Sequence, residues 1–141
     1  ILFADERAGV IGAVHAGWRG SVGKIAAECI DRMVSLGAEK RSIRAAIGPS
    51  ICAECFVVGD DFMTECEQKL GKELLDSFTY RKDGKWHADL KLLNKLVLLE
   101  NSVRDANIDV TKLCTYCNPD EFFSHRYHGE NRGTLCAMIS L

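Results

Sequence analysis

His15-Ala16-Gly17-Trp18-Arg19-Gly20 follows directly on the apolar run Val10-Ile11-Gly12-Ala13-Val14. The apolar run predicts a buried β-strand, so His15 is expected at the strand's end, where sites form on α/β scaffolds. Glycines on both sides of Trp18 let backbone and ligand approach closely, and Arg19 at the start of the next helix suits an anion. His15 is therefore a candidate functional residue, with a hydrogen-bonded core histidine as the alternative.

The rest of the chain predicts alternating strands and helices. Strands are expected at residues 1–4, 10–14, 43–47, 55–58, 110–116, 122–125 and 135–141, and the first two form a hairpin. Helices are expected at residues 21–36, 59–70, 72–78 and from residue 89 to near residue 107, with a turn at 81–85. This order predicts one domain of α/β (α+β) class, a mixed sheet with helices packed on it.

Local signals set the expected helix ends and the buried face of the first helix. Ser21 and Asp89 are expected N-caps, and Gly37 is the expected stop of the first helix. The apolar positions of that helix recur on one face: Ile25, Cys29, Met33 and Leu36.

Composition narrows the class of protein. The chain has 141 residues, enough for one core, and its formal net charge of −2 argues against a general nucleic-acid or membrane surface. No apolar run is long enough to span a bilayer, and the start lacks the features of a signal peptide. Seven cysteines, an odd count, favour a reducing compartment over a disulfide framework. We therefore expect a cytoplasmic protein.

The hexapeptide 15–20 resembles the signature of the bacterial polyphenol-oxidase or laccase-domain family, whose members are described as metal-dependent purine nucleoside phosphorylases. Further matches follow in the family's order over nearly the whole chain: Ala46-Ile47-Gly48-Pro49-Ser50, Cys55-Phe56-Val57-Val58-Gly59, Ala88-Asp89-Leu90, Cys114-Thr115, Phe122-Phe123-Ser124-His125-Arg126 and Gly133. Each motif alone is weak, and the set is specific.

The resemblance implies a metal held by two histidines and one cysteine, of which His15 matches the last. The other two ligands lie upstream of the position that Ile1 matches, so residues 1–141 are expected to be the C-terminal part of one longer domain. On that expectation the chain alone is inactive and exposes a sheet edge. Zinc is the expected metal and copper the alternative.

The resemblance also implies an activity, the phosphorolysis of adenosine, inosine or methylthioadenosine, and family members are credited with zinc-dependent adenosine deamination. His15 and Arg19 are the expected catalytic residues. The expected substrate contacts are Trp18, Thr115, Ser124 and Arg126. The guanidinium groups of Arg19 and Arg126 are the expected phosphate binders, with surface salt bridges as the alternative.

The chain departs from the family pattern near its C-terminal end. Tyr127 and His128 stand where relatives usually carry a second arginine and an acidic residue. Arg132-Gly133-Thr134 replaces a Thr-Gly-Arg sequence, which leaves open whether Arg132 takes over the role of that arginine.

Other functions remain open on chemical grounds. A copper-dependent polyphenol oxidase would use similar ligands, but the sequence has no dense histidine cluster for a multicopper relay. A thiol hydrolase with an upstream cysteine and His15 as base is a further option. His87 is expected to be a surface or capping residue.

The non-enzymatic alternative is a structural zinc module built from Cys52-x-x-Cys55 and Cys114-x-x-Cys117. However, 58 residues separate Cys55 from Cys114, against roughly 15–20 in a usual zinc ribbon. A local set, Cys114, Cys117, His125 and His128, is tighter than the zinc-finger spacing. Packing as small apolar residues is favoured for Cys29, Cys52, Cys66 and Cys136.

Overall fold

The computed structural model describes residues 1–141. They divide into two compact units, Ile1–Gly48 with Asn94–Thr111 and Cys136–Leu141, and Pro49–Leu93 with Lys112–Leu135. Each unit combines strands and helices, so the mixed α and β class expected from the sequence is confirmed. None of the helices is both long and apolar enough to cross a membrane.

The first unit is built on a four-stranded sheet of order β2-β1-β3-β7. Its strands are β1 (Leu2–Asp5), β2 (Val10–Ala13), β3 (Arg44–Ile47) and β7 (Ile108–Val110). β1 runs antiparallel to β2 and to β3, whereas β3 and β7 are parallel. The predicted hairpin is thus confirmed, and β2 and β7 are the edge strands of a mixed sheet.

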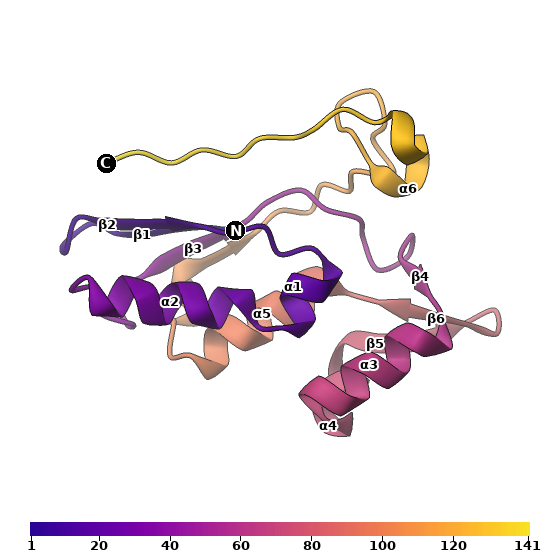
Figure 1. The fold of residues 1–141 in the computed structure, drawn as a ribbon, viewed down its shortest axis with the longest axis horizontal. Helices are drawn as coiled ribbons and strands as arrows, with labels where there is room; N and C mark the ends of the chain where they lie inside the picture. Colours follow the sequence, from indigo (N-terminus) through magenta and orange to yellow (C-terminus); the bar gives the residue numbers. More distant parts are fainter. The chain divides into compact units, whose positions relative to one another are not determined.

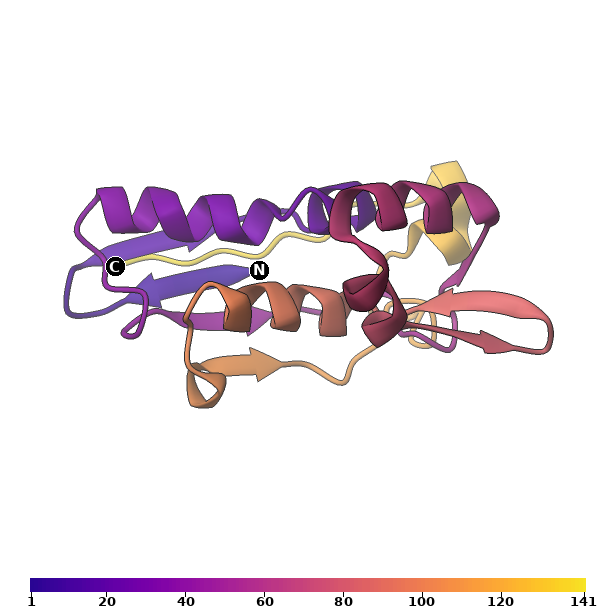
Figure 2. The same cartoon turned by 90° about the horizontal axis from the view of Figure 1, so that it is seen from below.

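Helices cover one face of this sheet (Figures 1 and 2). They are α1 (Trp18–Val22), α2 (Ile25–Ser35) and the part of α5 (Leu90–Glu100) that belongs to this unit. The core is made of buried apolar side chains from the sheet and the helices: Phe3, Ala45, Ile47, Ala26, Ile30, Met33, Val97 and Leu98. Gly12 permits close contact, because a Cβ there would lie 2.7 Å from the Sγ of Cys29.

The helix predicted at residues 21–36 is instead broken after α1. Lys24 takes a left-handed conformation, with φ of 55°, and α2 begins at Ile25. Ser21 is not an N-cap: it lies inside α1, fully buried, and its Oγ donates to the carbonyl of Ala16. Leu36 is 71% exposed because α2 ends at Ser35, so its assignment to the buried face was wrong. Gly37, with φ of 103°, is the predicted stop.

The second unit holds a three-stranded antiparallel sheet of order β4-β6-β5. Its strands are β4 (Val57–Val58), β5 (Thr79–Lys82) and β6 (Lys85–Ala88), and its complete helices are α3 (Asp60–Leu70), α4 (Lys72–Phe78) and α6 (His125–His128). α3 and α4 match the predicted helices. The prediction missed the β5–β6 hairpin, which a two-residue turn joins at Asp83 and Gly84, both with positive φ.

The expectations for residues 89–116 are confirmed only in part. Asp89 caps α5 as expected, since its Oδ1 accepts from the N–H of Leu92 at 3.0 Å. However, α5 ends at Glu100, and a 3-10 turn (η1, Asp105–Asn107) follows, so the helix is shorter than predicted. The predicted strand 110–116 is reduced to the end of β7 and one isolated bridge between Ser50 and Cys114.

No strand forms at residues 122–125 or 135–141. The first segment leads into α6, followed by a 3-10 turn (η2, Gly129–Asn131). The second is extended but makes no ladder, and within the first unit its residues 136–141 run on the side of the sheet opposite to α2 (Figure 1).

Candidate functional site

His15 lies in the loop between β2 and α1, and its side chain is exposed. Its ring makes no hydrogen bond within the chain, so the alternative of a hydrogen-bonded core histidine was wrong. The loop requires its glycine beside this ring, because a Cβ at Gly17 would lie only 2.8 Å from the Nε2 of His15. The absence of a side chain at residue 17 therefore keeps that ring nitrogen accessible.

Trp18 and Arg19 form the first turn of α1, directly after this loop. The Cζ of Arg19 lies 4.1 Å from the centre of the Trp18 ring, a cation–π contact. Arg19 is exposed and pairs with no carboxylate, so the surface salt bridge considered for it does not form. Stacking on the indole restrains the guanidinium and leaves its hydrogen-bond donors available to an anion.

Three other candidates from the sequence belong to the second unit. Thr115 and Ser124 are buried, and their backbone N–H groups donate to the carbonyl of Ser50 and to the Nδ1 of His128. Arg126 is exposed, and both of its terminal nitrogens donate to the carbonyl of Val57, at 3.1 and 3.2 Å. The predicted alternative of a salt bridge is wrong for Arg126 as well, because its partner is an uncharged carbonyl.

An aromatic cluster surrounds α6 and was missed by the sequence analysis. Tyr127 contacts Tyr116 and His128 edge to face, with ring centres 5.6 and 4.9 Å apart, and His128 also contacts Phe123. Phe123 and Tyr127 are 48% and 55% exposed. The signal was the density of aromatic residues and histidines between residues 122 and 128.

The residues around this cluster include the departures from the family pattern. His128 accepts the N–H of Ser124 through its Nδ1, which gives it a role in shaping the turn. Arg132 is exposed. Next to it, Gly133 passes close to the Phe123 ring, where a Cβ would lie 2.5 Å from the ring atoms.

A cavity in the first unit does not include the candidate residues of that unit. It has a volume of about 580 Å³ and is lined by β1, β3, residues 106–109 and Ile139. None of His15, Trp18 and Arg19 lines it.

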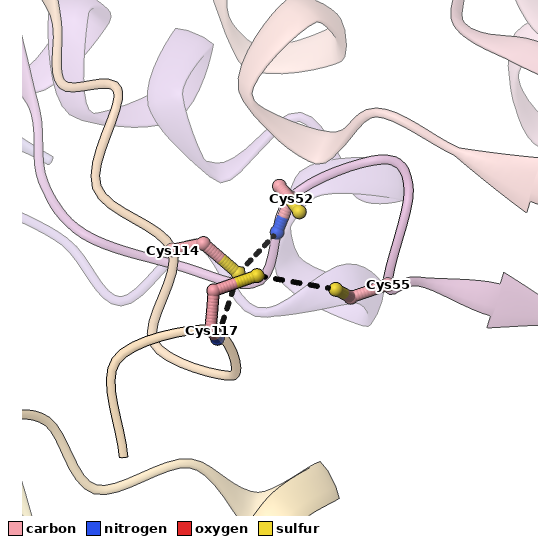
Figure 3. A group of neighbouring side chains, drawn as sticks. All are labelled: Cys52, Cys55, Cys114 and Cys117. Carbon is pink, nitrogen blue, oxygen red and sulfur yellow. Dashed lines mark hydrogen bonds between the residues drawn. The ribbon is translucent and has the colours of Figure 1, made fainter. Parts of the chain in front are cut away.

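Two pairs of cysteines come together in the second unit (Figure 3). The Sγ atoms of Cys52, Cys55, Cys114 and Cys117 all lie within 4.8 Å of one another, so this group can hold a metal ion. The sequence analysis disfavoured this set because of its long spacing, and treated Cys52 as a packing residue. The alternative set with His125 and His128 does not form.

His87 helps to shape this part of the second unit. It is buried rather than on the surface, its Nδ1 lies 3.0 Å from the carbonyl oxygen of Ala53, and its ring stacks on Tyr80. The expectation of a surface or capping role was therefore wrong. Of the remaining cysteines, Cys66 is buried as expected, whereas Cys136 is exposed.

Comparison with known proteins identifies the family. The family model described as "Multi-copper polyphenol oxidoreductase laccase" matches residues 1–141. The chain is 41% identical over 134 residues to "Adenosine deaminase RL5" of an unknown prokaryotic organism, covering 94% of this chain and 51% of that protein. It is 37% identical over 142 residues to "Purine nucleoside phosphorylase" of Deinococcus radiodurans, covering 100% and 53%. The chain therefore belongs to the multi-copper polyphenol oxidoreductase laccase family, as the resemblance indicated.

Solved structures support the same assignment. The hypothetical protein YfiH of Bacillus licheniformis is similar with a TM-score of 0.81 and 33% identity, over 89% of this chain and 48% of that one. YlmD of Geobacillus stearothermophilus gives a TM-score of 0.76 and 30% identity, over 89% and 47%. The chain thus spans about half the length of the proteins it matches.

Proposed function

We propose that the protein containing this chain catalyses the phosphorolysis of purine nucleosides. Two neighbouring features of the loop and of α1 carry the proposal. The imidazole of His15 is exposed and makes no hydrogen bond, and four residues later the guanidinium of Arg19 stacks on Trp18 and has no carboxylate partner. The names of two relatives, a purine nucleoside phosphorylase and an adenosine deaminase, support purine nucleosides as the substrates.

The reaction sets clear chemical requirements. A phosphate oxygen forms a bond to the anomeric carbon of the ribose, while the glycosidic bond breaks and the purine leaves with the electron pair and takes up a proton. The phosphate must be held and its charge balanced, which a guanidinium does with paired donors. We assign this role to Arg19. The ring of Trp18 holds that guanidinium and offers an apolar surface to the substrate.

We further propose that His15 is one ligand of a metal site. The fit rests on the accessible Nε2 above Gly17, because an imidazole is a suitable ligand for zinc and also for copper. Zinc bound there would supply Lewis-acid chemistry. Zinc sites use three or four protein ligands, so the remaining ligands are proposed to come from outside residues 1–141, and residues 1–141 alone are proposed to be inactive.

Arg126 is proposed as a second phosphate contact. Its guanidinium bonds only to the carbonyl of Val57 and lies over the Phe56 ring, at 5.4 Å from the ring centre. These contacts fix its position and leave its charge uncompensated. Thr115 and Ser124 are weaker candidates for substrate contact, because both are buried.

We propose a reducing compartment such as the cytoplasm as the location. The seven cysteines of the chain, none of which forms a disulfide, support this proposal.

The test is product chromatography on the purified full-length protein that contains this chain. Incubation with inosine should release hypoxanthine and ribose 1-phosphate only when phosphate is present. Adenosine without phosphate should yield inosine and ammonia if the deaminase activity of the relative is shared. Oxidation of a phenol with added copper, without phosphate-dependent release of the base, would instead favour the oxidase function.

His15→Ala in the same protein should abolish both turnover and the metal bound at this site, with the fold retained by circular dichroism. A variant that keeps full activity would exclude His15 as a ligand.

A further inference from the structure

Each cysteine pair of the second unit lies on its own tight turn. In the first turn, the N–H groups of Cys55 and Phe56 donate to the carbonyl of Cys52, at 3.1 and 3.0 Å. In the second turn, the backbone N–H of Asn118 donates to the carbonyl of Cys114, and its side-chain Nδ2 donates to the same oxygen at 2.7 Å. Both turns therefore hold their two thiols on one side, although the pairs come from distant parts of the sequence.

The two turns are also joined by hydrogen bonds to sulfur and to backbone. The N–H groups of Cys52 and Cys117 donate to the Sγ of Cys114, at 3.2 and 3.4 Å (Figure 3). The N–H of Thr115 donates to the carbonyl of Ser50 at 3.2 Å. Donors aimed at a sulfur stabilise the thiolate, which is the form that binds metal.

The short distances between the sulfurs also favour a bound cation. The four Sγ atoms lie within 4.8 Å of one another, and four thiolates this close together repel one another unless a cation lies between them.

The size of the cluster suits one tetrahedral ion. Zinc–sulfur bonds of about 2.3 Å place the sulfurs of a tetrahedral site roughly 3.8 Å apart. Here all four sulfurs lie within 4.8 Å of one another, and those of Cys55 and Cys117 are 3.4 Å apart. These separations are close to those of a tetrahedral tetrathiolate site.

We propose that Cys52, Cys55, Cys114 and Cys117 bind a structural Zn²⁺. The ligand set is closed, with four thiolates and no position left for water, which is typical of structural and not of catalytic zinc. The site differs in ligands and in location from the one proposed at His15. Its role is to cross-link the two turns. They are separated by 58 residues in the sequence and are otherwise held together only by weak contacts.

The zinc also fixes parts of the molecule to which the proposed function assigns roles. Thr115 lies between two of the ligands, and Val57, whose carbonyl accepts both donors of Arg126, lies two residues after Cys55. Loss of the ion should therefore loosen the position of Arg126.

The first experiment measures the zinc content of the purified protein and of variants by elemental analysis. Cys55→Ser and Cys117→Ser should each lose one equivalent of zinc. The control variants Cys66→Ser and Cys136→Ser, whose thiols lie outside the cluster, should keep it. His15→Ala should also keep this equivalent, which separates the result from any failure of the proposed function.

The second experiment uses the unmutated protein, so its result does not depend on whether a variant folds. Cobalt substituted into the unmutated protein should give the intense sulfur-to-cobalt charge-transfer absorption and the visible bands of a tetrahedral tetrathiolate site. Unchanged zinc in both cluster variants would overturn the proposal. Iron in place of zinc, or a Cys55–Cys117 disulfide found by mass spectrometry under non-reducing conditions, would overturn it equally.

Discussion

Asn94 and Ser21, separated by 73 positions in the sequence, form a buried hydrogen bond in which the Nδ2 of Asn94 donates to the Oγ of Ser21 at 2.8 Å. Ser21 in turn donates to the carbonyl of Ala16, the residue after His15. The polar chain thus ties α5 to the start of α1 and to the loop that carries the candidate ligand.

Ser21→Ala should lower the free energy of unfolding by about 1–3 kcal/mol, because it leaves a buried amide and a carbonyl without this partner. Urea denaturation measures the change. Ser35→Ala is the matched control, since Ser35 is exposed and its Oγ donates only within α2, and its effect should stay below about 0.5 kcal/mol. Equal effects of the two variants would contradict the structural role of Ser21.

Gly12→Ala should destabilise the first unit by about 1–3 kcal/mol through overpacking. The added Cβ would lie 2.7 Å from the Sγ of Cys29 and 3.1 Å from the Sδ of Met33, so these side chains or the helix α2 that carries them would have to shift. Gly48→Ala serves as control, because a Cβ there meets no atom within 4 Å. An unchanged melting temperature for Gly12→Ala would contradict the predicted overpacking.

The stability of the protein should fall at acidic pH in part because of Asp5. Its carboxylate accepts the N–H of Glu39 at 2.8 Å and those of Arg7 and Ala8, and these bonds outweigh burial and lower the pKa of Asp5. A lowered folded-state pKa adds stability above the unfolded-state pKa of about 3.9. That contribution is lost as the pH falls from there through the lower folded-state value.

Asp5→Asn tests this prediction. The variant should be less stable near neutral pH, and its unfolding free energy should depend less on pH below about pH 4. Asp109→Asn, an exposed carboxylate on β7, is the control and should keep the acid dependence of the unmutated protein. If the stability of Asp5→Asn depends on acidic pH as strongly as that of the unmutated protein, the acid dependence comes from groups other than Asp5.

Arg19→Ala and Arg126→Ala should each raise the KM for phosphate by about tenfold or more, and the KM for nucleoside much less, because a charge-assisted hydrogen bond contributes about 1.5–3 kcal/mol. Steady-state kinetics with each substrate varied in turn measures the difference. Arg32→Ala, an exposed arginine on α2, is the control. Similar increases for both substrates would remove the phosphate role from that arginine.

Local signals were enough to predict much of the fold. The apolar runs predicted β1, β2 and β3, and Gly59 and Gly71 marked the start and the break of α3 and α4, because such signals act within a few residues. The β5–β6 hairpin was missed since its strands are polar, although Asp83-Gly84 is a hairpin turn signal.

Features that depend on distant contacts were not predictable. Serine is a residue type typical of N-caps, so the sequence alone placed Ser21 at a helix start. Only its buried contact with Asn94 shows that it lies inside a helix. The two Cys-x-x-Cys motifs were visible in the sequence, but the pairing of Ser50 with Cys114, which brings the two motifs together, was not. The position of His15 in the loop after β2 was predictable because its context is local, a strand end followed by glycines, and its functional role stays a prediction.

The parallel pairing of β3 with β7 has a consequence for how the chain folds. Ala45 pairs with Ile108, and the whole of residues 49–93 lies between them in the sequence. Such a non-local contact closes a long loop, which slows folding. During synthesis, β1, β2 and β3 emerge before β7, so one side of β3 stays unpaired until β7 is made. That interval is the stage at which the nascent chain is most exposed to aggregation and to capture by chaperones.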